Sequence, residues 1–227
     1  MTALQVEQTT SETIARRIEQ AILNHRLHPG TKLTEDELGS IYGVGRTLVR
    51  GALQMLTHKG LVETQRNRGA TVASPTVREA REVLEARSLL EPRTAHAAAK
   101  RARTGDIRLL RQHIEQEHAA LDVGDTGKAV YLSGEFHVAI ARIADQITIE
   151  QMIAALIARS SLIVALYWRR REALCESHAH HALIDAIDGK DGPLAEELMT
   201  SHLVDLASCL DLSDRPRPPR SLKDALT

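Results

Sequence analysis

Two helix signals separated by a very short turn, between Thr34 and Leu56, constrain the fold of this chain most strongly. Thr34 has the side chain of an N-cap, and Glu37 three residues later completes a capping box. Gly43 is suited to the left-handed conformation that ends many helices. Only three residues separate this helix from the next, which starts at Arg46, and that is the length of the turn in a helix-turn-helix motif. We therefore expect such a motif here.

The second of these helices has two chemically different faces. The apolar face, at helical spacing, consists of Val49, Ala52, Leu53 and Leu56, and the polar face consists of Arg46, Thr47, Arg50 and Gln54. Arginine can make a bidentate contact to guanine in the DNA major groove, so the polar face suits a recognition helix. In isolation such a stretch is more often an ordinary amphipathic helix with solvated arginines, and its surroundings decide between the two interpretations.

The segment after this helix has the pattern of a β-hairpin with a basic tip. Two short β-type runs, 61–65 and 70–73, flank a turn that contains Arg68 and Gly69. A helix-turn-helix followed by such a hairpin is a winged helix-turn-helix. The tip alone could be a solvated turn. After this helix pair we expect Arg68 and Gly69 to contact phosphates or the minor groove, because glycine lets the backbone approach closely.

Everything after Pro75 has the pattern of helices, with Pro92 expected to kink the first of them. The fold class is therefore mainly α, with an N-terminal winged helix-turn-helix and a C-terminal all-α helical bundle. We expect a DNA-binding domain over residues 1–75, an effector-binding and dimerisation domain over 76–211, and a disordered tail over 212–227, which is rich in proline and charge.

Composition excludes some classes of protein and leaves the DNA argument to local placement. The formal net charge is −1, so total charge does not indicate a nucleic-acid partner. The two cysteines, Cys175 and Cys209, form neither a metal-type pair nor a disulfide framework. We see no apolar stretch long enough to span a bilayer and no signal peptide, so we expect a soluble cytoplasmic protein without a membrane partner.

Three histidines fall on the apolar faces of three separate predicted helices. His137 lies beside Phe136 and Ile140, while His180 and His202 continue other apolar stripes. All three should point inward, and helical bundles build metal sites in their cores in this way. From spacing alone, satisfied core histidines are the better interpretation.

At this point the residues resemble a known family. The first half resembles the winged helix-turn-helix of GntR-family transcription regulators, and the second half resembles their FadR-type, or FCD, ligand-binding domain. The resemblance rests on the following residues: the run from Ile14 through Leu27, Pro29-Gly30, Leu33, Glu37-Leu38, Val44, Arg46-Thr47, Val49-Arg50, Ala52-Leu53, Leu56, Gly60-Leu61-Val62, Gly69, Glu82 to Arg87, Glu91-Pro92, Glu135-Phe136-His137, His180, Leu183, Ala186, Asp191, Ala195, Met199 and His202-Leu203.

The resemblance implies DNA contacts by Arg46, Thr47, Arg50 and the wing tip at Arg68-Gly69. The chain departs from the family at two positions, with Gly45 where Ser or Thr is usual and Leu48 where Pro is common. The missing hydroxyl at residue 45 removes a cap or a phosphate contact. We expect this departure to affect affinity more than the docking mode.

For the second domain, the resemblance implies a metal held by His137, His180 and His202 together with a carboxylate four residues before His137. Ser133 occupies that carboxylate position here, and a neutral hydroxyl is a poor ligand. Three neutral imidazoles can still hold a divalent ion such as Zn²⁺ and leave one position open.

The resemblance also places Arg87 against an effector carboxylate. The alternative for Arg87 is an ion pair with Glu91 one turn further along the helix. We expect the basic run Arg169–Arg171 to be solvated rather than to clamp a ligand.

We therefore expect a ligand-responsive transcription regulator, most simply a repressor. A homodimer would bind a pseudo-palindromic double-stranded DNA operator and release it when a small organic acid, a carboxylate, enters the helical domain. A first alternative is a constitutive dimeric DNA-binding protein without an effector. A second is a metal-dependent hydrolase that uses the three histidines, but none of their neighbours is an obvious general base. We predict no catalytic residues.

Overall fold

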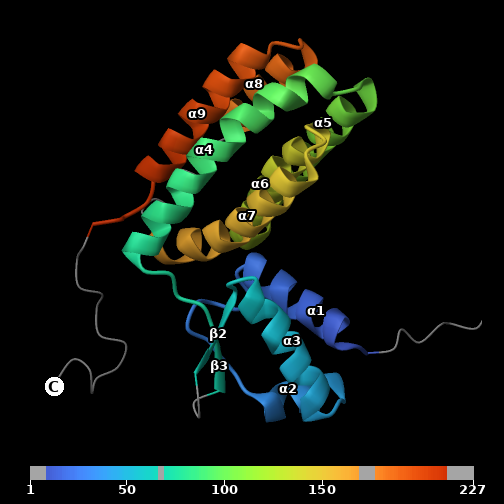
Figure 1. Cartoon of the computed structure of the whole chain (residues 1–227), viewed down its shortest axis with the longest axis vertical. Helices are drawn as coiled ribbons and strands as arrows, with labels where there is room; N and C mark the ends of the chain where they lie inside the picture. Colours follow the sequence, from blue (N-terminus) through green and yellow to red (C-terminus); the bar gives the residue numbers. More distant parts are fainter. Residues whose placement is uncertain (1–8, 66–68, 169–176, 214–227) are drawn as a thin grey trace, which may run out of the picture.

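The computed structural model of the chain describes residues 9–65, 69–168 and 177–213. It shows an N-terminal winged-helix head below a C-terminal helical domain (Figure 1). The elements of the head are α1 (Ser11–Leu23), β1 (Lys32–Leu33), α2 (Glu35–Tyr42), α3 (Arg46–His58), β2 (Val62–Gln65) and β3 (Gly69–Val72). Those of the helical domain are α4 (Val77–Arg101), α5 (Thr104–Asp122), α6 (Thr126–Ile143), α7 (Ile147–Tyr167), α8 (Ser177–Asp188) and α9 (Gly192–Ser208).

The predicted helix-turn-helix is confirmed in its local detail. The Thr34 hydroxyl accepts a hydrogen bond from the Glu37 amide at 3.3 Å, and α2 starts there. Gly43 ends the helix at φ +65°, in the left-handed region where an L side chain would be strained. α3 then starts at Arg46, and its N-cap, Gly45, offers no side-chain hydrogen bond.

The wing is present, and it is one strand larger than the sequence pattern indicated. β2 and β3 pair antiparallel, with Val62 opposite Val72. β1 pairs with the other edge of β3, which gives the sheet order β1-β3-β2. A strand of two residues is too short to show a periodicity, and this is why the sequence did not reveal β1. The predicted tip contact Arg68 lies outside the described residues.

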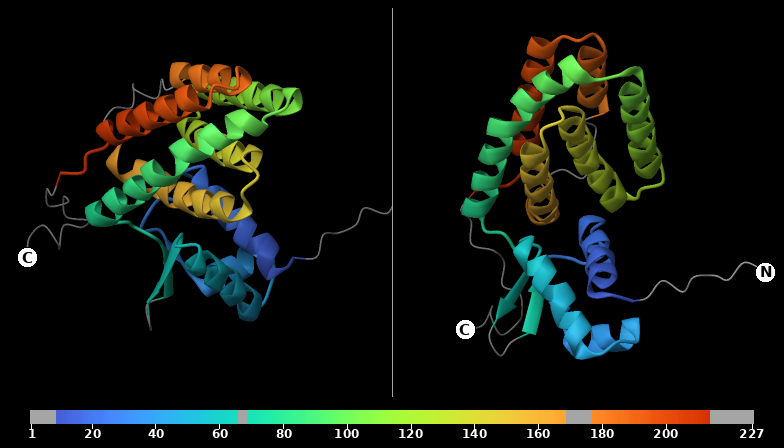
Figure 2. Two further views of the ribbon diagram at one scale, coloured as in Figure 1. Left: turned by 45° about the horizontal axis from the view of Figure 1, so that its top comes forward. Right: turned by 45° about the vertical axis from the view of Figure 1, so that its right-hand side comes forward.

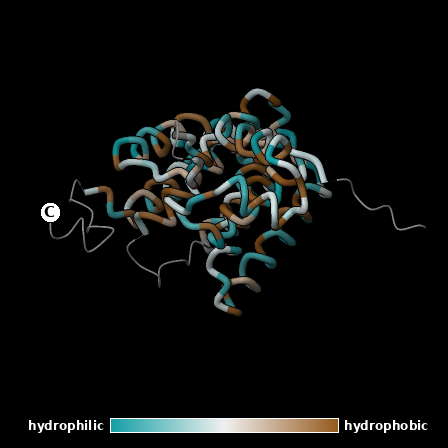
Figure 3. The backbone as a smooth tube through the Cα atoms, turned by 90° about the horizontal axis from the view of Figure 1, so that it is seen from below, coloured by the Kyte–Doolittle hydropathy of each residue, from teal (hydrophilic) through white to brown (hydrophobic). Residues whose placement is uncertain are grey.

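The second half is the expected all-α bundle, organised on the long helix α4. α4 packs along α9 and also contacts α6, α7 and α8, while α5 packs against α6 and α8. The helix continues through Pro92. Apolar and polar residues alternate along the helices, as the amphipathic pattern requires (Figure 3). The tail prediction falls on residues 214–227, outside the described residues, except for two positions.

Helix α7 belongs to both domains. Its residues Ala158 and Leu162 complete the hydrophobic core of the head, whereas Ile163 packs in the core of the helical domain. At the end of α1, His25 Nε2 lies 3.0 Å from the Ser161 backbone oxygen. Figure 2 shows α1 directly below the α6–α7 pair in both views.

The expectation that no apolar stretch reaches membrane length is wrong for α7. Ile147–Tyr167 has 21 residues and a mean hydropathy of 1.6 over its most apolar window, which is long and apolar enough to cross a bilayer. Such a composition also occurs in core helices. α7 packs on α4 and α6 and additionally on the head, and 28% of its most apolar window is buried.

Candidate functional site

His137, His180 and His202, from α6, α8 and α9, meet inside the helical domain as predicted. We call them the histidine cluster. The three residues are at most 3% exposed. His137 Nε2 and His202 Nε2 are 3.1 Å apart, and one ring nitrogen from each histidine lies within 4.8 Å of the other two. The helix periodicity that placed these residues inward was therefore correct.

Two buried glutamates lie behind the cluster. His137 Nδ1 is 2.6 Å from Glu91 Oε2, and His180 Nδ1 is 3.3 Å from Glu117 Oε2. A carboxylate at Nδ1 favours the tautomer with the proton on that nitrogen, which leaves Nε2 as a lone pair. The Nε2 atom of His180 has no hydrogen-bond partner among the described residues.

The electrostatics favour neutral His137 and His202 and an ionised Glu91. Burial lowers the pKa of His202 and of His137, although Glu91 works in the opposite direction on His137. Burial also opposes ionisation of Glu91, but the charge of Arg87 and the hydrogen bonds from Arg87 and His137 outweigh it and lower the Glu91 pKa to about 2. Neutral imidazoles are the form that binds a metal ion.

This donor set fits a divalent transition metal. Imidazole nitrogens lie about 2.0–2.1 Å from zinc in tetrahedral sites, so two of them stand roughly 3.3 Å apart, close to the separation seen between His137 and His202. The lone Nε2 of His180 is a buried polar atom that such an ion would satisfy. Ser133 is half-buried on the adjacent cavity wall, and the carboxylates Glu91 and Glu117 stand behind the imidazoles rather than beside them.

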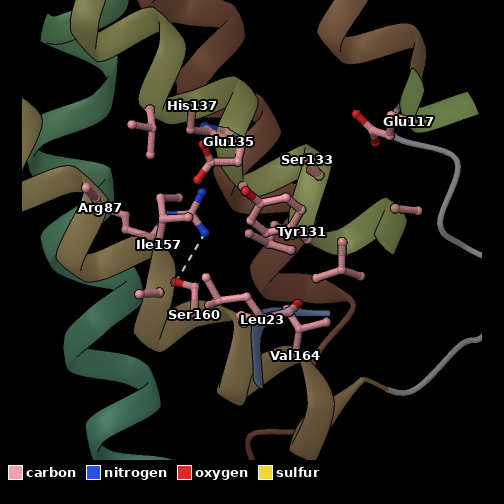
Figure 4. A pocket seen from close by; sticks show the side chains of 18 of the residues that line it. Leu23, Arg87, Glu117, Tyr131, Ser133, Glu135, His137, Ile157, Ser160 and Val164 are labelled. Carbon is pink, nitrogen blue, oxygen red and sulfur yellow. Dashed lines mark hydrogen bonds between the residues drawn. The ribbon is translucent and has the colours of Figure 1, made fainter. Parts of the chain in front are cut away.

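Arg87 forms the ion pair with Glu91 that was the alternative considered for it, and it also lies on the cavity wall. Its Nε donates to Glu91 Oε1 at 2.6 Å, and its Nη1 donates to the Ser160 hydroxyl at 3.3 Å. The side chain is 3% exposed and also lines the neighbouring cavity (Figure 4). The ion pair with Glu91 therefore exists without removing Arg87 from the cavity wall.

The cavity beside the histidine cluster has a volume of about 170 Å³. Helices α4, α5, α6, α7 and α9 form most of its wall, and Glu19 and Leu23 of the head close it on one side. Figure 4 shows His137 on one side of the space and Leu23 on the other. A cavity of about 150 Å³ can hold benzene, so this one suits a small metabolite.

Sequence reasoning missed three features of this site. It did not identify Glu117, did not connect Glu91 to His137, and did not bring α1 to the cavity. One signal was available, because Glu117 continues the apolar stripe of Leu110 and Ile114 on α5. A charged residue in such a stripe is rarely buried without a partner.

The polar face of α3 is exposed, and both of its arginines form ion pairs with acidic residues of α2. Arg46 Nη2 is 2.7 Å from Asp36 Oδ1, and Arg50 Nε is 2.7 Å from Glu35 Oε1. The hydrogen bond from Arg50 lowers the pKa of Glu35. Thr47 is exposed beside the arginines, and Gly69 is exposed at the start of β3. The run Arg169–Arg171 lies outside the described residues.

Comparison with known families divides the chain in the same way. Residues 10–72 match the family described as bacterial regulatory proteins, gntR family, and residues 82–205 match the FCD domain family. The second match alone spans more than half of the chain.

Curated relatives and solved structures agree with these matches. The transcriptional repressor RspR of Escherichia coli is 27% identical over 91% of both chains. The Uxu operon transcriptional regulator of the same organism is 29% identical, covering 85% of this chain and 83% of its own length. The E. coli McbR/YncC structure has a TM-score of 0.78 at 19% identity, covering 88% of this chain and 96% of its own. The structure of a putative GntR transcriptional regulator from Rhodococcus sp. RHA1 has a TM-score of 0.77 at 20% identity, covering 87% of this chain and 95% of its own. At these identities the structures support the fold alone.

Proposed function

The chain belongs to the GntR family of transcription regulators, in its FadR/FCD subfamily, and we propose that it is a repressor controlled by a small organic acid. One observation carries the proposal: a cavity beside the histidine cluster and Arg87 is closed by helix α1 of the DNA-binding head. A molecule in that cavity touches both domains. The relatives and families are transcription regulators, which are not enzymes.

The histidine cluster would hold a divalent metal ion, and Glu91 and Glu117 would orient His137 and His180. When bound, the ion supplies positive charge and an open position for an effector carboxylate. Arg87 adds a second positive group on the cavity wall, held in place by Glu91 and Ser160. Because Ser133 contributes no charge, the protein itself provides three neutral ligands.

The route from effector to DNA passes through α1 and α7. Leu23 lines the cavity, and its backbone oxygen accepts a hydrogen bond from the Ser161 hydroxyl at 3.2 Å. An effector that binds one head position better than another shifts the population toward that position by its difference in affinity. The head then loses the spacing that the operator requires.

On DNA, we propose that a homodimer in the cytoplasm reads a pseudo-palindromic operator with two copies of α3. Arg46, Thr47 and Arg50 face the major groove, and the wing at Arg68 and Gly69 contacts the adjacent backbone. The repressor role follows from similarity to RspR, which is named a transcriptional repressor. Sedimentation of the protein with operator DNA tests the two-to-one stoichiometry.

A thermal-shift screen of carboxylic acids tests the effector site, with and without zinc. Any ligand that binds the folded state raises the unfolding midpoint by mass action, so the operator need not be known. We expect acids to stabilise the metal-loaded protein and to weaken operator binding. Midpoints and DNA affinity that do not respond to any acid would support the constitutive alternative.

Metal analysis of untagged protein, purified without chelator, tests the histidine cluster directly. We expect one divalent ion per chain, and less than a tenth of that in His202→Ala. His113→Ala is the matched control, because His113 lies outside the cluster, with its Nε2 at 2.7 Å from the Leu132 backbone oxygen. Protein without stoichiometric metal contradicts this part of the proposal.

Base readout is tested with Arg46→Ala. We expect a loss of about 1–3 kcal/mol of discrimination at one base pair of each half-site. Arg108→Ala removes an exposed positive charge from α5, away from the reading face, and serves as the control. Equal weakening on specific and random DNA by Arg46→Ala would mean that this arginine only contacts phosphates.

A further inference from the structure

The cavity beside the histidine cluster contains more negative charge from the protein than an ordinary organic-acid site requires. Arg87 is its only arginine or lysine among the described lining residues, and Glu91 already neutralises it at 2.6 Å. Arg87 is the positive group expected to attract an acid, but together with Glu91 it has no net charge. The other charged side chains among the described lining residues are the carboxylates Glu19, Glu117 and Glu135.

Two of these carboxylates have no arginine or lysine partner within the described parts of the chain. Glu117 is 4% exposed, its Oε2 lies 3.3 Å from His180 Nδ1, and no arginine or lysine of the described residues forms an ion pair with it. Glu135 is half-buried on the wall formed by α6, with no arginine or lysine of the described chain within ion-pair distance. An unsatisfied buried carboxylate is costly, so its presence in a cavity points to a cation that arrives with a ligand.

The third lining carboxylate, unlike Glu117 and Glu135, has a lysine partner. Glu19 of α1 binds Lys59 of the head, with Nζ–O distances of 2.7 and 2.8 Å. Tyr131 lies near both Glu135 and Glu19. Burial raises the Tyr131 pKa, and these two carboxylates raise it further. Glu135 therefore remains the uncompensated charge at this end of the cavity.

We infer that the effector is an amino acid or a related amino-carboxylate, whose ammonium group binds Glu135 while its carboxylate faces the histidine cluster and Arg87. This inference rests on the proposed function and names the class of effector. With a divalent ion on the histidines, the ion balances Glu117 and Glu135, and the Arg87–Glu91 pair is neutral. A plain acid would leave one net negative charge in a space of low dielectric, whereas a zwitterion adds none.

The size of the cavity limits the ligand further. A volume of about 170 Å³ is only slightly larger than the benzene-sized cavity of about 150 Å³. Roughly six to eight non-hydrogen atoms fit, which matches a five-carbon amino acid and excludes acyl thioesters of nucleotide cofactors.

Calorimetry on full-length, zinc-loaded protein, dialysed free of excess metal, tests the inference with ligands of one carbon skeleton. The ligands are valerate and its 2-amino, 4-amino and 5-amino derivatives, which carry the ammonium at different distances from the carboxylate. We expect one amino derivative to bind about tenfold or more tightly than valerate, the effect of a hydrogen bond between charged groups.

Two variants assign the effect to one carboxylate. Glu135→Gln should abolish the preference for the amino derivative and leave the affinity for valerate unchanged or higher. Glu115→Gln removes the same charge from the exposed face of α5, outside the cavity, and should keep the wild-type preference.

The outcomes separate this inference from the proposed function. If valerate binds as tightly as every amino derivative, or if Glu135→Gln weakens both ligands alike, the effector is a plain acid and the inference is wrong. If neither these ligands nor any acid or amino acid of the thermal-shift screen binds, the proposed effector function fails as well.

Discussion

The Arg87–Glu91 ion pair allows a direct test of how strongly burial controls an electrostatic contact. We predict that Glu91→Ala destabilises the helical domain severely, because it leaves the Arg87 guanidinium buried without a counter-charge. The same helix contains a matched control: Arg78 and Glu82 form a pair with the same spacing of four residues, at 2.9 Å instead of 2.6 Å. The Arg78 and Glu82 side chains are 88% and 57% exposed, against 3% and 2% for the buried pair.

The magnitude follows from that difference in exposure. Removing one partner of a buried pair costs about 3–5 kcal/mol, which lowers the unfolding midpoint of a chain of this size by roughly 6–20 °C. Solvent screens the exposed pair, so Glu82→Ala should leave the midpoint almost unchanged. The fluorescence of Trp168, the single tryptophan, reports unfolding of the helical domain specifically.

Metal affinity provides a second readout of the same substitution. Glu91 also contacts His137, and loss of such a carboxylate typically weakens metal binding by about 10–100-fold. A zinc titration of Glu91→Ala below its unfolding midpoint measures this. If Glu91→Ala and Glu82→Ala change the midpoint by the same amount, the buried pair is not the stabilising contact that its geometry indicates.

Three further predictions concern the head and its junction with the helical domain. Glu35→Gln removes a carboxylate beside Arg50, so the affinity of the protein for random DNA should rise at low salt, and this gain should shrink at high salt. Equal affinities of the variant and the wild type, measured by fluorescence anisotropy at low salt, would contradict the prediction. In Gly127→Ala the new Cβ overlaps a backbone oxygen at the end of α1, so we expect an overpacking cost of about 1–3 kcal/mol in urea unfolding, whereas Gly105→Ala, which meets no neighbour, should cost nothing. Burial lowers the pKa of His25, so the unfolded chain binds more protons and stability should fall as the pH drops below 6.5; His25→Asn should show a smaller fall between pH 7.5 and 5.5.

Local signals in the sequence were enough to predict the helix-turn-helix and the β2–β3 hairpin of the head, though not the two-residue strand β1. The cap at Thr34, the left-handed glycine at Gly43 and the helix face that carries Arg46 depend on neighbours within a few residues. The same holds for the inward direction of His137, His180 and His202, because it follows from the apolar stripe of each helix. Each of these features depends on residues close together in the chain or on the periodicity of one helix, so it can be predicted from a single sequence.

The rest of the site depends on which helices become neighbours. Glu117 and His180 are brought together by the packing of α5 on α8, and no pattern within either helix encodes that contact. The approach of Leu23 to the cavity likewise depends on how the head docks on α7. For Glu91, the i,i+4 spacing identified Arg87 as a partner. It could not predict the second contact, with His137, because that residue lies on another helix.

The packing of α7 explains why a small ligand can affect a DNA-binding head. Ile157, Ala158 and Ser160 line the cavity, and Ala158 and Leu162, on the same two turns, belong to the core of the head. Protein cores are close-packed, so a displacement of this helix cannot be absorbed by empty space on the head side. A ligand that moves the cavity wall must therefore either repack the head core or shift the head as a unit. In the proposed homodimer, the second response would change the spacing of the two heads on DNA, while each α3 helix stays intact.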